Sequence, residues 1–267
     1  MVDVRFRVSS TLTAFALAVA PASAASSSWE TFAGGRVALV TSGVAGAGGK
    51  LRGALMIDLA PGWKTYWRDP GDAGVPPSLT LADGSPYTIA DIGFPAPQRI
   101  DDGATKWAGY KHPVALPLTF EADNAAGTIE ADVFLGVCET ICIPVQARLV
   151  VEPALDPDNA DDFGAVEAAF AALPAEAGPG FGAAVGEVRD DALVVSVEAP
   201  GEPAAVDLFV ASPEGYVLGT PERVDTDGRI SFAVPVFDQP TPRVAGAAIA
   251  YTLVAGETAV SGTLVLP

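Results

Sequence analysis

The sequence predicts an all-β protein with two β-sandwich domains joined by a short helical linker. Short apolar runs alternate with turn residues along the chain, and 28 Gly and 23 Pro are spread among them. This pattern is typical of many short strands and tight turns. The pattern is interrupted once, near residue 153, by a helical segment. A second series of strand-like runs follows, which indicates a second sandwich.

The first 24 residues have the pattern of a secretory signal peptide. Arg5 and Arg7 give a basic start, residues 11–20 are apolar, and Ala22-Ser23-Ala24 fits the small-residue cleavage rule. The apolar segment is shorter than the roughly 20 residues that cross a bilayer. We therefore expect cleavage after Ala24, export to an oxidising compartment, and no membrane insertion of the mature chain.

The first domain is predicted over residues 25–153. Strand patterns are clearest from Val114 to Val151, where "VALPLTFE" and "GTIEADVFLGV" precede "IPVQARLVVEP". In the last of these runs, apolar side chains recur at period two and share one face: Ile143, Val145, Ala147, Leu149 and Val151. The segment "GVCETICIP" between the strands holds both cysteines of the chain, Cys138 and Cys142.

The linker is predicted over residues 154–180 and the second, smaller sandwich over residues 181–267. Within the linker, Phe163, Val166, Phe170 and Leu173 are spaced for one face of a helix, which Pro174 would end. All four Trp, both Cys and the single His lie before residue 153. The chemistry is therefore assigned to the first domain.

Charge and composition exclude several kinds of partner and site. The net charge of −18 repels nucleic acid and anionic lipid, so neither is expected as a partner. His112 is the only histidine, which argues against a Ser-His-Asp triad and, with two Cys, against a zinc site. No metal and no cofactor are therefore expected. Copper handling by the soft thiolates stays open as an alternative.

The spacing of the cysteines constrains their geometry. On one straight strand their Cα atoms would lie about 13 Å apart, whereas a disulfide needs roughly 4.4–6.8 Å. A bonded pair therefore requires a tight turn at Glu139-Thr140-Ile141, with the cysteines opposed across a hairpin. The turn has no Gly, which predicts a distorted or bulged loop. So short a loop makes the disulfide a weak staple, which favours a redox role.

The neighbours of the cysteines along the chain do not favour a reactive thiolate. No Lys or Arg lies within five residues of either cysteine, and Glu139 is adjacent to Cys138. Glu139 and the surrounding apolar residues are expected to raise the pKa of the thiols, so that exchange waits for a docked partner. From the residues alone, a redox centre and a structural disulfide both stay open.

Four segments together resemble the periplasmic N-terminal domain of the DsbD/ScsB thiol:disulfide interchange family: "PGWKTYWRDPGDAGVPP" (61–77), "FPAPQRI" (94–100), "GYKHPVALPL" (109–118) and "GVCETICIP" (136–144). The resemblance implies an immunoglobulin-like sandwich with Cys138 and Cys142 as its redox pair. It implies electron flow from a membrane-embedded thiol reductase domain to periplasmic disulfide isomerases or thioredoxin-like proteins. It also places a cap loop near residues 101–110, with Asp101, Trp107 and Tyr110 as candidate shielding residues.

The chain also departs from the family. It carries no membrane domain and no thioredoxin domain, so we expect a separate protein to be its electron donor. Trp63 and Trp67 are expected to pack in the core against the disulfide. The resulting prediction is a periplasmic electron shuttle resembling a protein-disulfide reductase, with Cys142 favoured over Cys138 as the attacking thiolate. The alternatives are a binding or assembly module with a structural disulfide, and a thiol protein of copper stress.

Overall fold

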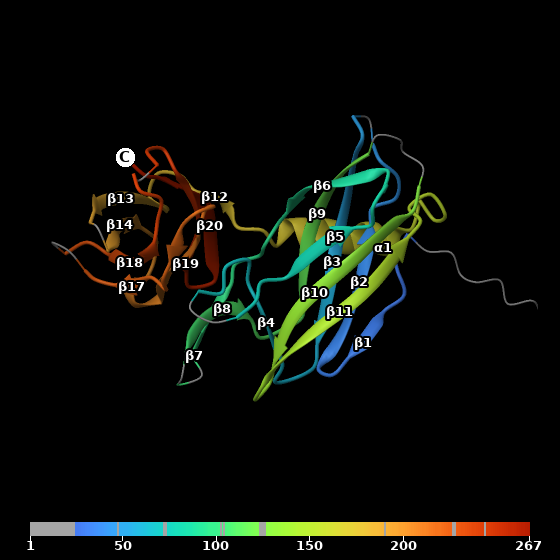
Figure 1. Cartoon of the computed structure of the whole chain (residues 1–267), viewed down its shortest axis with the longest axis horizontal. Coiled ribbons are helices and arrows are strands. Elements are labelled where there is room, and N and C mark those ends of the chain that lie inside the picture. Colours follow the sequence, from blue (N-terminus) through green and yellow to red (C-terminus); the bar gives the residue numbers. More distant parts are fainter. Residues whose placement is uncertain are drawn as a thin grey trace, which may run out of the picture.

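The computed structural model describes residues 25–46, 48–71, 74–101, 103, 105–122, 127–189, 191–225, 228–242 and 244–267. The predicted signal peptide, residues 1–24, lies outside them. The described chain consists mostly of strands, which form two sandwiches side by side along the long axis of the molecule (Figure 1). The predicted all-β fold with two sandwiches and a short intervening helix is confirmed.

One sheet of the first sandwich has the strand order β1-β2-β3-β9-β6, and its strands are antiparallel. Its strands are β1 (Glu30–Phe32), β2 (Gly35–Thr41), β3 (Lys50–Leu59), β9 (Val114–Ala122) and β6 (Tyr87–Ile92).

The facing sheet has the order β11-β10-β4-β8-β7, and β5 pairs with β10 beside this path. Its strands are β11 (Cys142–Val151), β10 (Ile129–Cys138), β4 (Lys64–Tyr66), β8 (Lys106–Tyr110), β7 (Gln98–Asp101) and β5 (Ser78–Leu81). β10 and β11 form a long hairpin in which Val145, Leu149 and Val151 point into the core. This burial confirms the predicted period-two face of β11.

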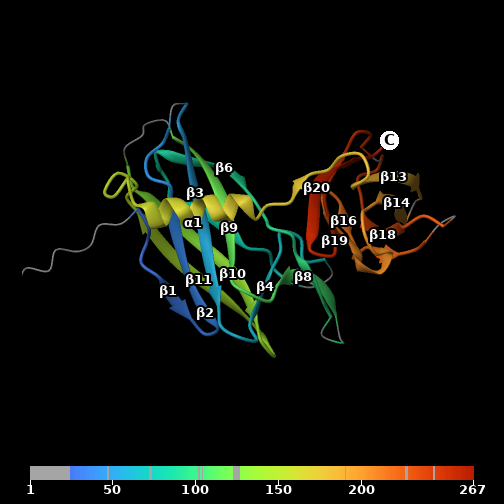
Figure 2. The same cartoon turned by 180° about the vertical axis from the view of Figure 1, so that it is seen from behind.

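Helix α1 (Ala160–Ala171) follows the first sandwich and packs across the outer face of the β2–β3–β9 sheet (Figure 2). The side chain of Asn159 caps its N-terminus by accepting from the backbone N–H groups of Asp161 and Asp162. Val166 is buried against the sheet, as predicted, but Phe163 is 53% exposed. Phe163 lies one turn before Val166, at the flank of the face that the sheet covers.

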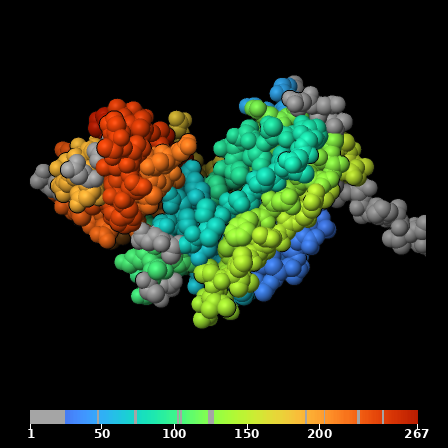
Figure 3. Space-filling model, viewed as in Figure 1, coloured from blue at the N-terminus to red at the C-terminus, as the bar shows by residue number. Residues whose placement is uncertain are grey.

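The second sandwich has one sheet of order β12-β20-β19-β15 and one of order β13-β14-β18-β16, with β17 beside β18. Its elements are β12 (Ala175–Glu176), β13 (Gly182–Val188), β14 (Ala192–Glu198), η1 (Pro203–Ala205), β15 (Val206–Ala211), β16 (Val217–Leu218), β17 (Glu222–Arg223), β18 (Ser231–Asp238), β19 (Ala248–Ala255) and β20 (Thr258–Val265). A separate apolar core between the two sheets includes Leu208, Val234 and Leu253. The space-filling view shows this sandwich lying against the end of the first one (Figure 3).

Candidate functional site

The two cysteines occupy the tip of the β10–β11 hairpin. Cys138 is the last residue of β10, Cys142 is the first of β11, and the two are directly opposed in the strand register. They form a disulfide with their Cα atoms 4.1 Å apart. The turn between them is closed by the Glu139 N–H, which donates to the carbonyl oxygen of Ile141 at 3.3 Å. The tight three-residue turn predicted from the spacing is confirmed.

The two cysteines differ sharply in exposure. Cys138 is 4% exposed, whereas Cys142 is exposed and follows Ile141, which is 71% exposed. A macromolecular thiol can therefore approach the disulfide from the side of Cys142, while Cys138 faces the protein.

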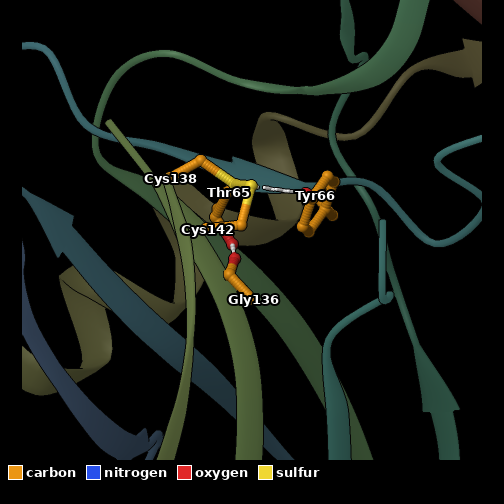
Figure 4. Close-up of a disulfide and its surroundings, with 5 residues drawn as sticks. All are labelled: Thr65, Tyr66, Gly136, Cys138 and Cys142. Carbon is orange, nitrogen blue, oxygen red and sulfur yellow. Dashed lines mark hydrogen bonds between the residues drawn. A yellow bond between two sulfur atoms is a disulfide. The ribbon is translucent and has the colours of Figure 1, made fainter. Parts of the chain in front are cut away.

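The hydroxyl of Tyr66 contacts both sulfur atoms. Its oxygen lies 3.1 Å from the Sγ of Cys138 and 3.1 Å from the Sγ of Cys142 (Figure 4). Because the sulfurs of a disulfide carry no hydrogen, the hydroxyl is the donor. Tyr66 ends β4, which pairs with the end of β10, and the Oγ1 of Thr65 donates to the carbonyl oxygen of Gly136 at 2.8 Å. This pairing fixes the tyrosine over the disulfide.

Two glycines make room for the Tyr66 ring. A Cβ on Gly136 would lie 2.7 Å from the ring, and a Cβ on Gly74 would lie 2.3 Å from it. Gly74 also has a φ of +122°, a conformation that side chains disfavour. The sequence around the site therefore requires Gly at both positions if Tyr66 is to reach the sulfurs.

A small apolar cluster covers the buried side of the disulfide. Tyr66, Ile100, Trp107 and Cys138 are all buried and pack together. The rings of Tyr66 and Trp107 have centroids 4.6 Å apart and are tilted by 54°. We call Tyr66, Ile100 and Trp107 the shield. These three residues cover the buried side of Cys138.

The other predicted site residues lie in different surroundings. Tyr110 is in the main core, its hydroxyl donates to the carbonyl oxygen of Pro95 at 2.8 Å, and burial raises its pKa well above the usual value. Asp101 ends β7, where its carboxylate accepts from the Gly103 N–H at 2.9 Å. Glu139 is exposed in the turn. Trp107 alone of the three candidate shielding residues packs with Cys138.

Trp67 lies in the core, as predicted, but it packs against the second sandwich rather than against the disulfide. Trp67 is fully buried, but its ring meets Phe209 of the second sandwich, with centroids 6.0 Å apart. Trp63 is partly buried and packs at the edge of the main core beside Gly34. Because neighbouring residues of an extended chain face opposite sides, the residue that points at the disulfide is Tyr66.

Sequence reasoning also missed a cation near the disulfide. Lys64 is opposed to Cys138 in the β4–β10 register, although 74 positions separate them in the chain. Directly opposed residues of antiparallel strands have Cβ atoms about 4.5–5.5 Å apart on one face.

Among the described residues, no group of three or more His, Cys, Asp or Glu side chains is placed to hold a metal ion.

Comparison with known proteins agrees with these observations. Residues 36–153 match the family model described as "Thiol:disulfide interchange protein DsbD, N-terminal". A solved structure, the N-terminal periplasmic domain of ScsB from Proteus mirabilis, superposes with a TM-score of 0.72 at 23% identity, covering 92% of this chain and all of that one. This likeness establishes the fold of both sandwiches. No curated protein matches the chain. None of the helices in the described part is long and apolar enough to span a membrane.

Proposed function

We propose that this chain is a periplasmic thiol–disulfide exchange protein, because residues 36–153 match the model of the DsbD N-terminal family. It relays electrons from a membrane-embedded thiol reductase domain to oxidised periplasmic proteins of the thioredoxin-like or disulfide isomerase kind. The observation that carries the proposal is the asymmetry of the disulfide: Cys142 is exposed, Cys138 is buried, and one tyrosine hydroxyl contacts both sulfurs.

In the loading step, a thiolate of the donor attacks the Sγ of Cys142. A mixed disulfide forms, and the Cys138–Cys142 bond breaks with Cys138 leaving as a thiolate. The second thiol of the donor then attacks the donor's other sulfur, which is bonded to Cys142 in the mixed disulfide. Cys142 is released. The donor is oxidised to a disulfide, and this chain gains two electrons and two protons.

In the delivery step, the Cys142 thiolate attacks a disulfide of the acceptor and forms a mixed disulfide with one of its sulfurs. Cys138 then attacks Cys142, which restores the intramolecular bond and releases the acceptor as a dithiol. The exposure of Cys142 and the burial of Cys138 favour this order.

Three side chains are proposed to tune the thiols. The Tyr66 hydroxyl contacts both sulfurs and stabilises either one as a thiolate, since hydrogen bonds to charged groups are the stronger ones. Lys64 supports the Cys138 thiolate by charge from across the strand pair. Glu139, exposed in the turn, opposes thiolate formation by like charge and keeps the pair slow with random oxidants.

Residues 25–153 are proposed as the redox domain, residues 154–180 as the linker and residues 181–267 as the second domain. The first core gathers residues from β2 to β11, and the second gathers residues from β14 to β20. Two separate cores support two units. One residue of the second unit, Phe209, nevertheless belongs to the first core.

Single-cysteine variants test the exchange chemistry. Reduced Cys138→Ser and Cys142→Ser proteins would be mixed with a thioredoxin-fold disulfide isomerase that keeps only the exposed cysteine of its pair, carried as a mixed disulfide with thionitrobenzoate, and the products separated without reductant. Cys138→Ser should accumulate the mixed disulfide, because Cys142 attacks and nothing resolves the bond, while Cys142→Ser should accumulate far less.

The opposite outcome would identify a structural disulfide. In that case neither variant forms the adduct, reduced wild-type protein transfers no electrons to the isomerase, and the double Cys→Ser variant loses several kcal/mol of folding free energy. A binding module would then be the better description of the chain.

A further inference from the structure

The strands that carry the shield have two faces, and the second sandwich covers the other face. Tyr66, Ile100 and Trp107 point toward the disulfide. Their immediate chain neighbours Trp67, Arg99 and Ala108 face the opposite way and line a small cavity with residues of the second sandwich. One short piece of sheet, held by the β4–β8 and β7–β8 pairings, thus serves both the site and the contact between sandwiches.

The contact with β15 is specific and partly buried. The side chain of Asp207 accepts from the Nε and Nη2 of Arg99 at 3.2 and 2.9 Å, and Nη2 also donates to the carbonyl oxygen of Leu208 at 2.7 Å. The same guanidinium lies 4.3 Å from the centroid of the Phe209 ring. Bidentate pairing and stacking together fix the orientation of Arg99.

Phe209 inserts into the first sandwich. Its side chain is 2% exposed, it belongs to the core cluster of the first sandwich, and its ring meets Trp67 edge-on at an interplanar angle of 64°. Beside it, the N–H of Ser212 donates to Asp69 at 2.7 Å, and the other oxygen of that carboxylate accepts from the Gly71 N–H at 3.1 Å. The segment just after Tyr66 is therefore tied to the second sandwich.

We propose that the second sandwich is a brace for the shield, with Asp207 and Phe209 as positioning residues that hold Tyr66 and Trp107 over the disulfide through Arg99 and Trp67. β4 and β7 are only three and four residues long, and such short strands hold their position weakly without packing on both faces. When β15 is docked, small thiols are kept from the buried side of the disulfide. The inference rests on the proposed function, because a shield is useful only for a pair that exchanges electrons selectively.

The test measures how fast a small dithiol reduces the disulfide. Dithiothreitol gives two electrons to the Cys138–Cys142 bond, becomes a cyclic disulfide, and leaves two protein thiols that can be trapped by alkylation. The variants are Asp207→Asn, which removes the charge without changing the shape of the side chain, and Phe209→Ala. Asp225→Asn is the matched control, because it removes the charge of Asp225 from the ion pair with Arg223 within the second sandwich and leaves the Arg99–Asp207 pair in place.

Asp207→Asn should raise the reduction rate about threefold and Phe209→Ala about tenfold. The contacts stabilise the closed state of the shield, so their removal increases the population of a minor open state in which the disulfide is accessible. Asp225→Asn should match wild type. In a Trp107→Ala background, Phe209→Ala should add less than about twofold, because the shield through which it acts is already broken.

Rates of Asp207→Asn and Phe209→Ala within about twofold of the Asp225→Asn control would overturn the brace. The brace would also be overturned if Phe209→Ala raised the reduction rate by the same factor in the Trp107→Ala background as in wild type. If Phe209→Ala unfolds the second sandwich, as near-ultraviolet circular dichroism would reveal, Asp207→Asn alone decides. The assay uses no protein partner, so a failed proposal for the relay leaves these rates interpretable, and a failed brace leaves the mixed-disulfide experiment unaffected.

Discussion

Replacing Tyr66 by Phe removes the one hydroxyl that contacts both sulfurs while keeping the ring that packs on Trp107. A hydrogen bond to a charged group contributes about 1.5–3 kcal/mol. If the hydroxyl donates to a thiolate in the reduced protein, its loss should raise the pKa of that thiol by about one unit, at 1.36 kcal/mol per unit. The thiolate fraction near neutral pH then falls about tenfold.

The loss of thiolate is partly offset by reactivity. A thiolate of higher pKa is a better nucleophile, with a Brønsted coefficient of about 0.4–0.5. A tenfold loss of thiolate and a roughly threefold gain in nucleophilicity leave the exchange rate of Tyr66→Phe about threefold below wild type at pH 7. The assay is the rate of iodoacetamide alkylation of the reduced protein as a function of pH.

Tyr87→Phe is the matched control for this prediction. Tyr87 is also buried, but its hydroxyl has no hydrogen-bond partner among the described residues, and it lies on β6 of the other sheet. Its removal should leave the alkylation profile unchanged. A Tyr66→Phe profile whose midpoint lies within about 0.3 pKa units of wild type, too small a shift for a lost hydrogen bond to a charge, would refute the role of the hydroxyl.

Three further predictions follow from the same contacts. Gly136→Ala places a Cβ 2.7 Å from the Tyr66 ring and should lower the free energy of unfolding by about 1–3 kcal/mol. Its control, Gly164→Ala, adds a Cβ in open space on α1 and should raise the free energy of unfolding slightly. Urea titrations compare the two variants. Lys64→Gln should raise the pKa of the Cys138 thiol by less than about one unit, read from alkylation of the reduced Cys142→Ser protein. Burial, with the charges of Asp156 and Asp161, raises the pKa of Asp162, so its carboxyl is harder to ionise in the folded protein than in the unfolded chain. Ionisation therefore disfavours folding above this raised pKa, and the stability advantage of Asp162→Asn at pH 7 should shrink as pH falls toward the unfolded pKa, near 4. An advantage that is constant with pH would contradict that reasoning.

The hairpin of the cysteines was predictable because it is local. Strand patterns on both sides of "CETIC" leave only a turn, and the distance limit of a disulfide fixes the opposition of Cys138 and Cys142. The absence of Gly in the turn predicts a distorted loop, and the structure closes it with a 3.3 Å bond between Glu139 and Ile141.

Tyr66 was not predictable from local pattern. It lies 72 residues before Cys138 in the chain, and the pairing of β4 with β10 depends on how the whole sheet assembles. In "GWKTYW" the large aromatic residues Trp63 and Trp67 attract attention, yet alternation along the strand turns Tyr66 toward the sulfurs and Trp67 away. The available signal was Gly136, two residues before Cys138, which leaves space for a ring.

The contact between the sandwiches was also outside the reach of sequence reasoning. Phe209 appears in "AAVDLFVAS" as an ordinary strand residue, and nothing in that run indicates that it enters the core of another unit. Arg99 and Asp207 are 108 residues apart, and a single sequence does not show which charges pair.

The reduction potential of the Cys138–Cys142 bond tests the central claim most directly. The mature protein would be equilibrated in glutathione buffers of graded ratio, and its free thiols trapped by alkylation and counted by mass. The account predicts a potential between about −180 and −270 mV, the range of working exchange proteins. A value well below about −300 mV would contradict the account and make the bond a structural one.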